Sequence, residues 1–505
     1  MTGPVAPVEV LSEGEQRFER VRQRAGLYLT PLVVVALWLA PLDGLTTPAH
    51  RLAVVLGAVV TLWVTEALPL PVTALAGAAA CVVLGVAPAR EVFAPFADPL
   101  MFLFIGAFML SRAIFLHGLD RRFAFAVLSL PWIGARPGRI LVAFGAVTAA
   151  MSAWISNTAT TAMMFGIGLS IIAFLRENEK AGGSRVSPRY ATGLMLMTAF
   201  AASIGGLATP VGTPPNVIGL GFMRTALGVE VPFFRWMMIG VPVVVVLYAF
   251  LAWYLGALSP AGVREISGAR EMIARERARL GGWTRAQRSA ATAFGVTVAL
   301  WVIPGIAALL LGERSPTYLA LSRSIPEGVA ALVGALLLFV LPGEGDRRAI
   351  TWDEAVRIDW GVVLLYGGGF ALGVLSFQTG LAEAMGRGLT GLLPISSEFG
   401  LLVASVLVAV ILSEATSNTA AANMVVPVVI SIATAAGMDP FEPALGATMA
   451  ASLGFMLPVS TPCNAIVYGS GLVPLSRMIR YGFMLDVAGV VVIVTLVRLL
   501  GAFVR

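Results

Sequence analysis

Long apolar runs follow one another along almost the whole chain, separated by short polar segments. A run of about 18 or more apolar residues is long enough to cross the hydrocarbon core of a membrane as a helix. Runs such as 241–247 are apolar on every face and lack the alternation of a barrel strand. The pattern predicts an all-α polytopic membrane protein with about eleven transmembrane helices, at 27–42, 51–66, 68–87, 98–117, 190–222, 232–258, 288–311, 328–342, 358–377, 441–472 and 481–503.

Two further apolar stretches, 139–175 and 398–436, are too long for one helix. Each carries the tetrapeptide Ser-Asn-Thr-Ala near its middle, at 156–159 and 417–420. Polar side chains at membrane depth are costly and usually functional, although hydrogen bonding between helices is an alternative role for them. We therefore expect two re-entrant helical hairpins with the tetrapeptides at their tips.

The composition agrees with a membrane protein, because 58% of the residues are hydrophobic and only 12% are charged. The basic residues also predict an orientation. The segments 1–26, 118–139, 176–189, 259–288, 343–357 and 476–480 hold 24 of the 34 Lys and Arg residues, and the positive-inside rule places them in the cytoplasm. This orientation explains the net charge of +6 without a nucleic-acid partner. It predicts a multi-pass protein of the inner (plasma) membrane with a cytoplasmic N-terminus and no cleavable signal sequence.

Motifs for catalysis or redox chemistry are not evident. Cys81 and Cys463 lie in apolar runs and do not indicate a disulfide. The two histidines, His50 and His117, cannot form a histidine-rich metal site, and no phosphate-binding loop occurs. We therefore expect neither ATP-driven transport nor an enzyme. An integral-membrane enzyme or receptor is a remote alternative, because the sequence shows no recognisable nucleophile, base or metal cluster.

The tetrapeptide belongs to a longer internal repeat. Upstream, Gly-Ala-Phe at 106–108 matches Gly-Gly-Phe at 368–370. Downstream, the segment 201–216 matches 450–464, including Thr-Pro-Pro-Asn at 213–216 and Thr-Pro-Cys-Asn at 461–464. Three matches in the same order indicate two homologous halves. Because the two hairpins enter from opposite sides, the halves have inverted topology, as in many secondary transporters.

The proline motifs predict a helix break in each half, within 190–222 and 441–472, because proline removes a donor and clashes with the preceding turn. Free carbonyls at membrane depth are tolerated where protein, water or a ligand satisfies them. Together with hydroxyl and amide oxygens they suit a hard cation such as Na⁺. The helix N-termini at the same breaks attract anions. Bound sodium ions would offset the desolvation of a dianion, which gives a physical reason for coupled binding.

These motifs together resemble the divalent anion/sodium symporter (DASS) family of the ion transporter superfamily. The segment from Trp352 to Gly369 is also similar to that family, and the resemblance covers nearly the whole chain after residue 27. It implies a homodimer in membrane lipid that moves C4-dicarboxylates such as succinate, malate or fumarate into the cell with Na⁺ as the coupling ion. It also implies an elevator mechanism, in which one part of each protomer slides against a scaffold.

The resemblance divides the chain into six parts. A cytoplasmic N-terminal segment, 1–26, precedes the scaffold part of the first repeat, 27–138, and its transport part, 139–258. A cytoplasmic basic linker, 259–287, joins the repeats. The scaffold part of the second repeat is 288–397 and its transport part is 398–505.

The family pattern implies at least two sodium sites and one substrate site. The first sodium site consists of Ser152, Ser156, Asn157 and the Gly212 carbonyl, and the second of Ser413, Thr416, Asn418 and the Ser460 carbonyl. The substrate carboxylates meet Asn157, Thr158, Thr213, Asn418, Thr419, Thr461 and Pro462. Two positions depart from the family pattern. Cys463 replaces a proline, and Ser460 replaces a small apolar residue.

Four other polar features need an interpretation, and two of them, Glu414 and Arg112, have two alternative roles. Glu414 either pairs with a neighbouring group in a structural role or binds a proton or cation. Arg112 either forms a salt bridge or snorkels to the membrane surface, or it is a counter-ion for the substrate. Asp486 is expected at the membrane interface, and 264–288 is expected to form a cytoplasmic amphipathic helix with a possible regulatory role. The alternative functions are sodium-independent dicarboxylate exchange, or transport of citrate or sulfate.

Overall fold

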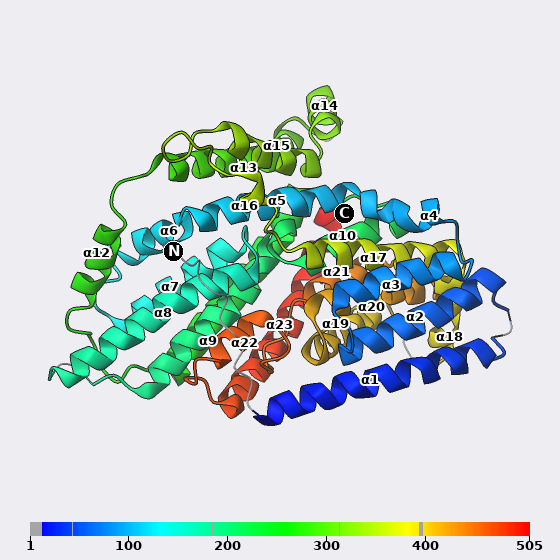
Figure 1. Ribbon diagram of the computed structural model, residues 1–505, viewed down its shortest axis with the longest axis horizontal. Coiled ribbons are helices and arrows are strands. Elements are labelled where there is room, and N and C mark those ends of the chain that lie inside the picture. The colour runs from blue at the N-terminus through cyan, green and yellow to red at the C-terminus, as the bar shows by residue number, and fades with distance from the viewer. Residues whose placement is uncertain (1–12, 43, 183–184, 313, 393–396) are drawn as a thin grey trace.

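The structure is a computed structural model that describes residues 13–42, 44–182, 185–312, 314–392 and 397–505, and the regular elements in these ranges are helices (Figure 1). The first half of the chain contains α1 (Glu13–Leu39), α2 (Thr47–Thr65), α3 (Leu70–Val83), α4 (Ala89–Phe93), α5 (Pro99–Leu116), α6 (Leu119–Leu128), α7 (Pro137–Ser152), α8 (Asn157–Lys180), α9 (Pro188–Gly205), α10 (Pro214–Leu227) and α11 (Phe233–Leu258).

The second half begins after a linker that holds α12 (Ala269–Arg279). It contains α13 (Arg285–Leu311), α14 (Pro316–Ser324), α15 (Glu327–Val340), α16 (Trp352–Ala355), α17 (Trp360–Gln378), α18 (Leu381–Leu392), α19 (Glu398–Ala415), α20 (Asn418–Ala435), α21 (Phe441–Ala450), α22 (Pro462–Tyr468) and α23 (Leu475–Val504).

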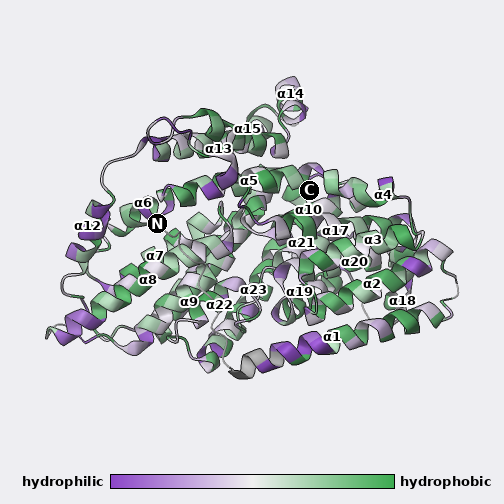
Figure 2. Ribbon diagram, in the orientation of Figure 1, coloured by the Kyte–Doolittle hydropathy of each residue, from purple (hydrophilic) through white to green (hydrophobic). Residues whose placement is uncertain are grey.

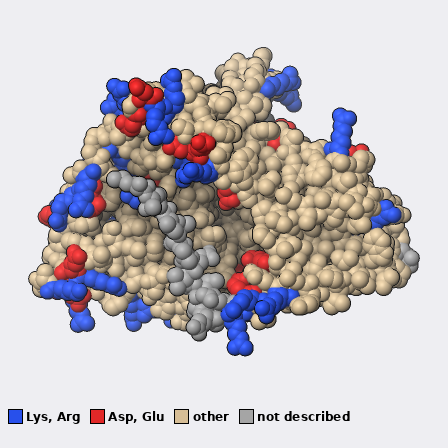
Figure 3. All heavy atoms as spheres, viewed as in Figure 1, with Lys and Arg blue, Asp and Glu red and all other residues tan. Residues whose placement is uncertain are grey.

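Within the described ranges, ten helices are long and apolar enough to cross a membrane, or eleven if α14 and α15, bent by 59°, form one span. This confirms the prediction of an all-helical polytopic membrane protein. Apolar residues run along most helices in Figure 2. Charged side chains gather around α12, the far end of α8 and the start of α1 in Figure 3, whereas the surface over α2 and α3 is largely uncharged.

Two helices differ from the predicted spans. Helix α1 begins at Glu13, well before the predicted start at residue 27. Its polar first half is held by Arg22, whose guanidinium lies 2.9 Å from a carboxylate oxygen of Glu19 and 2.9 Å from one of Glu66. Helix α3 has only 14 residues, fewer than the predicted 68–87. Residues 1–12 of the predicted cytoplasmic N-terminal segment lie outside the described residues.

The repeat is visible in how the helices of the two halves pack on each other. Helices α3 and α15 have the same length of 14 residues, and each packs on a helix of the other half, α3 on α17 and α15 on α5. Glycines of the repeat allow both approaches. A Cβ at Gly106 would overlap the backbone of Ala331, and one at Gly368 would overlap that of Ala74. Small residues at such crossings let helix backbones come close.

The two tetrapeptides lie at the turns of two helical hairpins. Helices α7 and α8 are joined by residues 153–156 in the left half of Figure 1, and α19 and α20 are joined by 416–417 in the right half. Each hairpin is followed by an interrupted helix. The chain leaves helical geometry between α9 and α10, apart from two short 3₁₀ turns, and between α21 and α22. Both interruptions fall within the stretches where the proline motifs predict them.

One asparagine braces each interruption in the same way. The Asn216 amide donates to the carbonyl oxygens of Gly206 at 3.0 Å and Thr209 at 2.9 Å. The Asn464 amide donates to those of Gly454 at 3.0 Å and Leu457 at 2.9 Å. These side chains satisfy carbonyls that the broken helix leaves free, so the last residue of each proline motif stabilises the break.

The first hairpin tip is anchored by an aromatic stack. The Trp154 ring stacks on Phe233 and Trp301, with ring centroids 6.1 and 6.5 Å away, and Phe233 and Trp301 stack at 4.6 Å. Trp301 belongs to α13 in the second half, and its indole donates to the Glu327 carbonyl at 3.0 Å. The stack therefore ties the tip to helices outside the hairpin.

The basic linker forms a shorter helix than predicted, α12, of 11 residues. It packs on α6. The residues that follow α12 are held by Arg122 of α6. Its guanidinium donates to the Leu280 and Gly282 carbonyls at 2.8 Å each and lies 5.2 Å from the Trp283 ring. The linker is thus fixed to α6 by both packing and hydrogen bonds.

Candidate functional site

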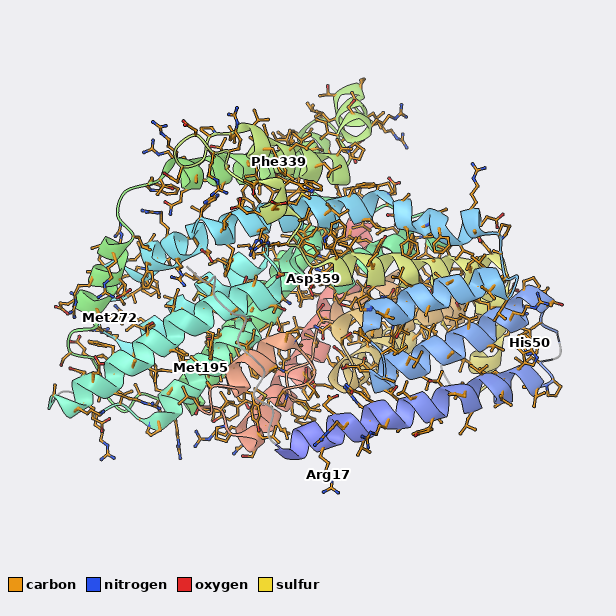
Figure 4. All side chains as sticks on the ribbon, viewed as in Figure 1. Arg17, His50, Met195, Met272, Phe339 and Asp359 are labelled. Atoms are coloured by element: carbon orange, nitrogen blue, oxygen red, sulfur yellow. The ribbon has the colours of Figure 1, made fainter. Side chains whose placement is uncertain are left out.

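A cavity of about 600 Å³ lies where both hairpin tips and both helix interruptions meet. Figure 4 places Asp359, one of its lining residues, near the middle of the molecule. The cavity wall from the hairpins and interruptions includes Ser156, Asn157, Thr158, Gly212, Thr213, Ser417, Asn418, Thr419, Ser460, Thr461, Pro462 and Cys463. The structure therefore brings together all seven residues that the family pattern implies for the substrate, from segments up to about 300 positions apart.

The tetrapeptides form the first turns of α8 and α20. Ser156 and Ser417 are the N-caps, and their hydroxyls accept from the backbone N–H of Ala159 at 3.3 Å and of Ala420 at 3.2 Å. The next two residues, Asn and Thr, begin the helix, where backbone N–H groups have no intrahelical acceptor. The partial positive charge of both helix ends is directed at the cavity, which suits an anion.

Four oxygen-bearing groups converge behind the first tip. The carboxamide of Asn157 lies 3.1 Å from the Ala202 carbonyl oxygen, 3.2 Å from that of Gly212 and 2.7 Å from the Ser152 hydroxyl. With its nitrogen toward these groups, the amide donates to the carbonyls. With its oxygen toward them, the two carbonyls and the amide form a cluster of acceptors that is stable only around a cation.

A similar cluster lies behind the second tip. The Ser413 hydroxyl is 2.8 Å from the Asn418 amide oxygen and 2.8 Å from the Ala451 carbonyl oxygen. The Asn418 amide nitrogen donates to the Ser452 carbonyl at 3.4 Å. Ala202 and Ala451 are matched positions of the sequence repeat. Their carbonyls are site atoms that the sequence reasoning missed, although the repeated Ala-Ala-Ser motif marks the segment.

The residues implied as sodium ligands divide into two layers. Ser152, Ser413 and Thr416 are almost fully buried behind the cavity wall. Ser156, Gly212 and Ser460 lie in the wall beside the two asparagines. The Thr416 hydroxyl donates to the Leu412 carbonyl at 2.8 Å, within its own helix. The two oxygen clusters thus lie deeper than the cavity, and Asn157 and Asn418 lie between each cluster and the cavity.

Three charged residues line the cavity from the opposite side: Arg112 on α5, and Arg357 and Asp359 just before α17. Arg112 forms no salt bridge with any residue that the structure describes, and its Nε is buried without a partner. No ion pair between described residues supports the salt-bridge interpretation of Arg112, and its side chain lines the cavity. Sequence reasoning missed Arg357 and Asp359, since nothing in the local pattern indicates that this turn meets the hairpins.

The prediction for Asp486 is also wrong. Its side chain is only 4% exposed and lies against Glu414 of the second hairpin. Hydropathy places Asp486 near the start of a span, but the face of α23 that carries it packs on α19 and α21 rather than facing the interface. Glu414 is 5% exposed and accepts from Met456 N–H at 2.7 Å and from the Ser460 hydroxyl at 2.6 Å. It is therefore at least a structural partner of the second interruption.

The fold is shared with known transporters. It matches the YdaH transporter of Alcanivorax borkumensis with a TM-score of 0.53 and 15% identity, covering 96% of this chain and 98% of the other. It matches MtrF of Neisseria gonorrhoeae, described as one of a class of antimetabolite efflux pumps, with a TM-score of 0.56 and 13% identity over 94% of both chains. The fold is thus that of a multi-pass membrane protein with a cavity between its two halves.

Sequence comparison gives the family. The model described as the sodium:sulfate symporter transmembrane region matches residues 22–504. The sodium-dependent dicarboxylate transporter SdcS of Staphylococcus saprophyticus is 33% identical over 493 residues, 96% of this chain and 93% of the relative. SdcS of Staphylococcus aureus strain USA300 is 32% identical over 482 residues, 94% and 90% of the two chains. The chain belongs to the divalent anion/sodium symporter family.

Proposed function

We propose that this protein is a secondary active transporter that imports C4-dicarboxylates, such as succinate, malate and fumarate, together with Na⁺. The observation that carries the proposal is the duplicated arrangement at the cavity. Two helix N-termini face the cavity, and an oxygen cluster lies behind each of them. The names of the SdcS relatives support both the ion and the substrate class.

The geometry gives a reason for coupling. Asn157 and Asn418 each belong to a cation cluster and to the cavity wall. A sodium ion in a cluster orients the amide oxygen inward, so the amide nitrogen turns toward the cavity and can donate to a carboxylate. The charge of the ion also offsets the desolvation of the dianion. Sodium therefore prepares the anion site, and the anion strengthens sodium binding by the same factor.

We also propose the arrangement around this site. The parts 27–138 and 288–397 form a scaffold that carries the contact of a homodimer, and 139–258 and 398–505 form the moving part of an elevator. The segment before 27 and the linker 259–287 lie in the cytoplasm, and the protein resides in the plasma membrane surrounded by lipid. The basic residues of the predicted cytoplasmic segments support this orientation.

The deciding experiment is uptake of labelled succinate into proteoliposomes that contain the purified protein. A sodium gradient should drive uptake above the level reached when Na⁺ is replaced by K⁺ or choline. Equal uptake without Na⁺ would reject symport in favour of exchange, especially if internal dicarboxylate accelerated it. Uptake of citrate or sulfate but not of succinate would reject the substrate class.

Arg112 provides a prediction about the substrate. Its side chain lines the cavity and forms no salt bridge with a residue in the described ranges, so we expect it to attract a carboxylate. Arg112→Gln should raise the KM for succinate by about tenfold, which corresponds to about 1.4 kcal/mol. The KM should also become less sensitive to ionic strength. Arg90→Gln on α4, an exposed position outside the cavity lining, is the control. An unchanged KM in Arg112→Gln would remove this residue from the substrate site.

A further inference from the structure

A pair of buried carboxyl groups, Glu414 and Asp486, lies beside the second interruption. Glu414 is on α19 at the hairpin tip and Asp486 is on α23, and the two interact directly. Their side chains are 5% and 4% exposed. Neither forms a salt bridge with a residue in the described ranges. Two carboxylates in contact, away from water, require a positive charge between them, because like charges in a low-dielectric interior repel strongly.

The free lone pairs define where that charge would lie. Each Glu414 oxygen already accepts one hydrogen bond, from Met456 N–H at 2.7 Å or from the Ser460 hydroxyl at 2.6 Å. Both Asp486 oxygens are buried and make no hydrogen bond of good geometry with the described residues, although the backbone N–H of Phe455 lies nearby. The unused acceptor capacity is thus greater on Asp486 than on Glu414. Carboxylate oxygens of this kind are ligands of hard cations.

The pair breaks the symmetry of the repeat. The position of the first half that matches Glu414 is Ala153, and the one that matches Ser460 is Gly212. The capped tip, the oxygen cluster and the bracing asparagine are each duplicated. The unusual hydroxyl of Ser460 has a clear partner here, since it donates to both the carboxylate and the backbone carbonyl of Glu414, at 2.6 and 3.0 Å.

We propose that Glu414 and Asp486 form a third sodium site, which exists only in the second half. This inference rests on the proposed sodium-coupled import and adds an ion to it. Sodium between the carboxylates neutralises one of their two charges. This third site adjoins the second oxygen cluster, because Ser413 of that cluster is the residue directly before Glu414. Two Na⁺ with one dianion carry no net charge. A third makes import electrogenic, and the membrane potential then contributes about 2.3 kcal/mol per 100 mV.

The test is the number of sodium ions per succinate, obtained in proteoliposomes from the Na⁺ gradient at which net flux of labelled succinate stops while the membrane potential is held fixed. Wild type should require about three Na⁺ per succinate, and Asp486→Asn should require about two and lose its response to membrane potential. In purified protein, labelled Na⁺ bound per chain should fall by about one. Glu414→Gln should give the same change, and Asp486→Glu should retain the wild-type ratio.

Asp120→Asn is the matched control. Asp120 is as buried as Asp486, at 4% exposed, but lies on α6, and its carboxylate accepts from the backbone N–H of Arg121 at 2.8 Å. Burial raises the pKa of Asp120 to about 6, so at pH 7.5 the control also removes a negative charge. Its ratio should equal that of wild type.

Three results would overturn the third site. The first is an unchanged Na⁺ ratio in Asp486→Asn. The second is that Asp486→Asn loses proton flux but keeps its number of Na⁺ per succinate, which would show that the two carboxyl groups share a proton and do not bind a metal ion. The third is a wild-type ratio of two. Sodium-independent uptake by the wild-type protein is a different result, which rejects the proposed symport itself and the third site with it.

Discussion

Asn157→Ala should reduce sodium-driven succinate uptake by at least about 100-fold, since it removes the proposed cation ligand and the proposed carboxylate donor together. Losing an interaction with a charged group costs about 3 kcal/mol, which is about 100-fold in binding. The Asn157 carboxamide contacts both carbonyls of the first oxygen cluster. Asn418→Ala should have the same effect through the second cluster. The measurement is initial uptake in proteoliposomes over a range of Na⁺ concentrations.

Asn178→Ala is the control for this prediction, because Asn178 lies on the same helix α8, about 20 positions beyond the tip. It should leave uptake near the wild-type value. Thermal unfolding of all three variants should occur close to the wild-type temperature. Normal transport in both Asn157→Ala and Asn418→Ala would show that the site lies elsewhere.

Gly206→Ala should remove more than about nine-tenths of the uptake, while its counterpart Gly454→Ala should keep about half or more. A Cβ at Gly206 would overlap the carboxamide of Asn157, so the amide must leave the first cluster. A Cβ at Gly454 would lie 3.3 Å from both the Asn418 amide oxygen and the Ser413 hydroxyl, a close but tolerable contact. Neither glycine has a positive φ, and the φ of Gly206 is −58°, so the difference is steric.

Gly206 and Gly454 are equivalent in the structure, because the carbonyl of each accepts from the bracing asparagine of its half. The same chemical change at both positions makes this comparison specific. A general loss of helix stability would affect both variants alike, whereas the geometry predicts that the first is much worse. Sodium dependence provides a second readout, because Gly206→Ala should shift half-maximal activation to higher Na⁺ concentration wherever uptake is still measurable. Equal residual activity in the two variants would contradict the geometry of the first cluster.

The sequence was sufficient to predict the hairpin tips and the helix breaks, because both depend on local chemistry. A serine N-cap and a proline inside an apolar run act on their own neighbours. The partner of a side chain could not be predicted in the same way. Asp486 meets Glu414, and Arg112 meets the cavity, only because of how distant helices pack. The carbonyls of Ala202 and Ala451 carry no side-chain signal at all.

The start of the first helix was predicted incorrectly for a similar reason, namely a contact between distant residues. Residues 13–26 are mostly polar, so hydropathy predicts that the first span begins only at residue 27. Arg22 nevertheless joins this segment to Glu66 through an ion pair at 2.9 Å. Hydropathy measures the preference for lipid, and it does not measure whether a polar helix is held by another part of the protein.

The aromatic stack at the first tip would act as a built-in optical reporter of movement. Trp154 moves with the hairpin in the proposed elevator, whereas Trp301 stays with α13. Sliding one past the other must separate the rings, with a loss of about 0.5–1.5 kcal/mol for each stacked pair. The emission of these indoles should therefore change between the two ends of the transport cycle. Trp154 and Trp301 could report that change without an attached dye, and the stacking energy would bias the resting population toward the state described here.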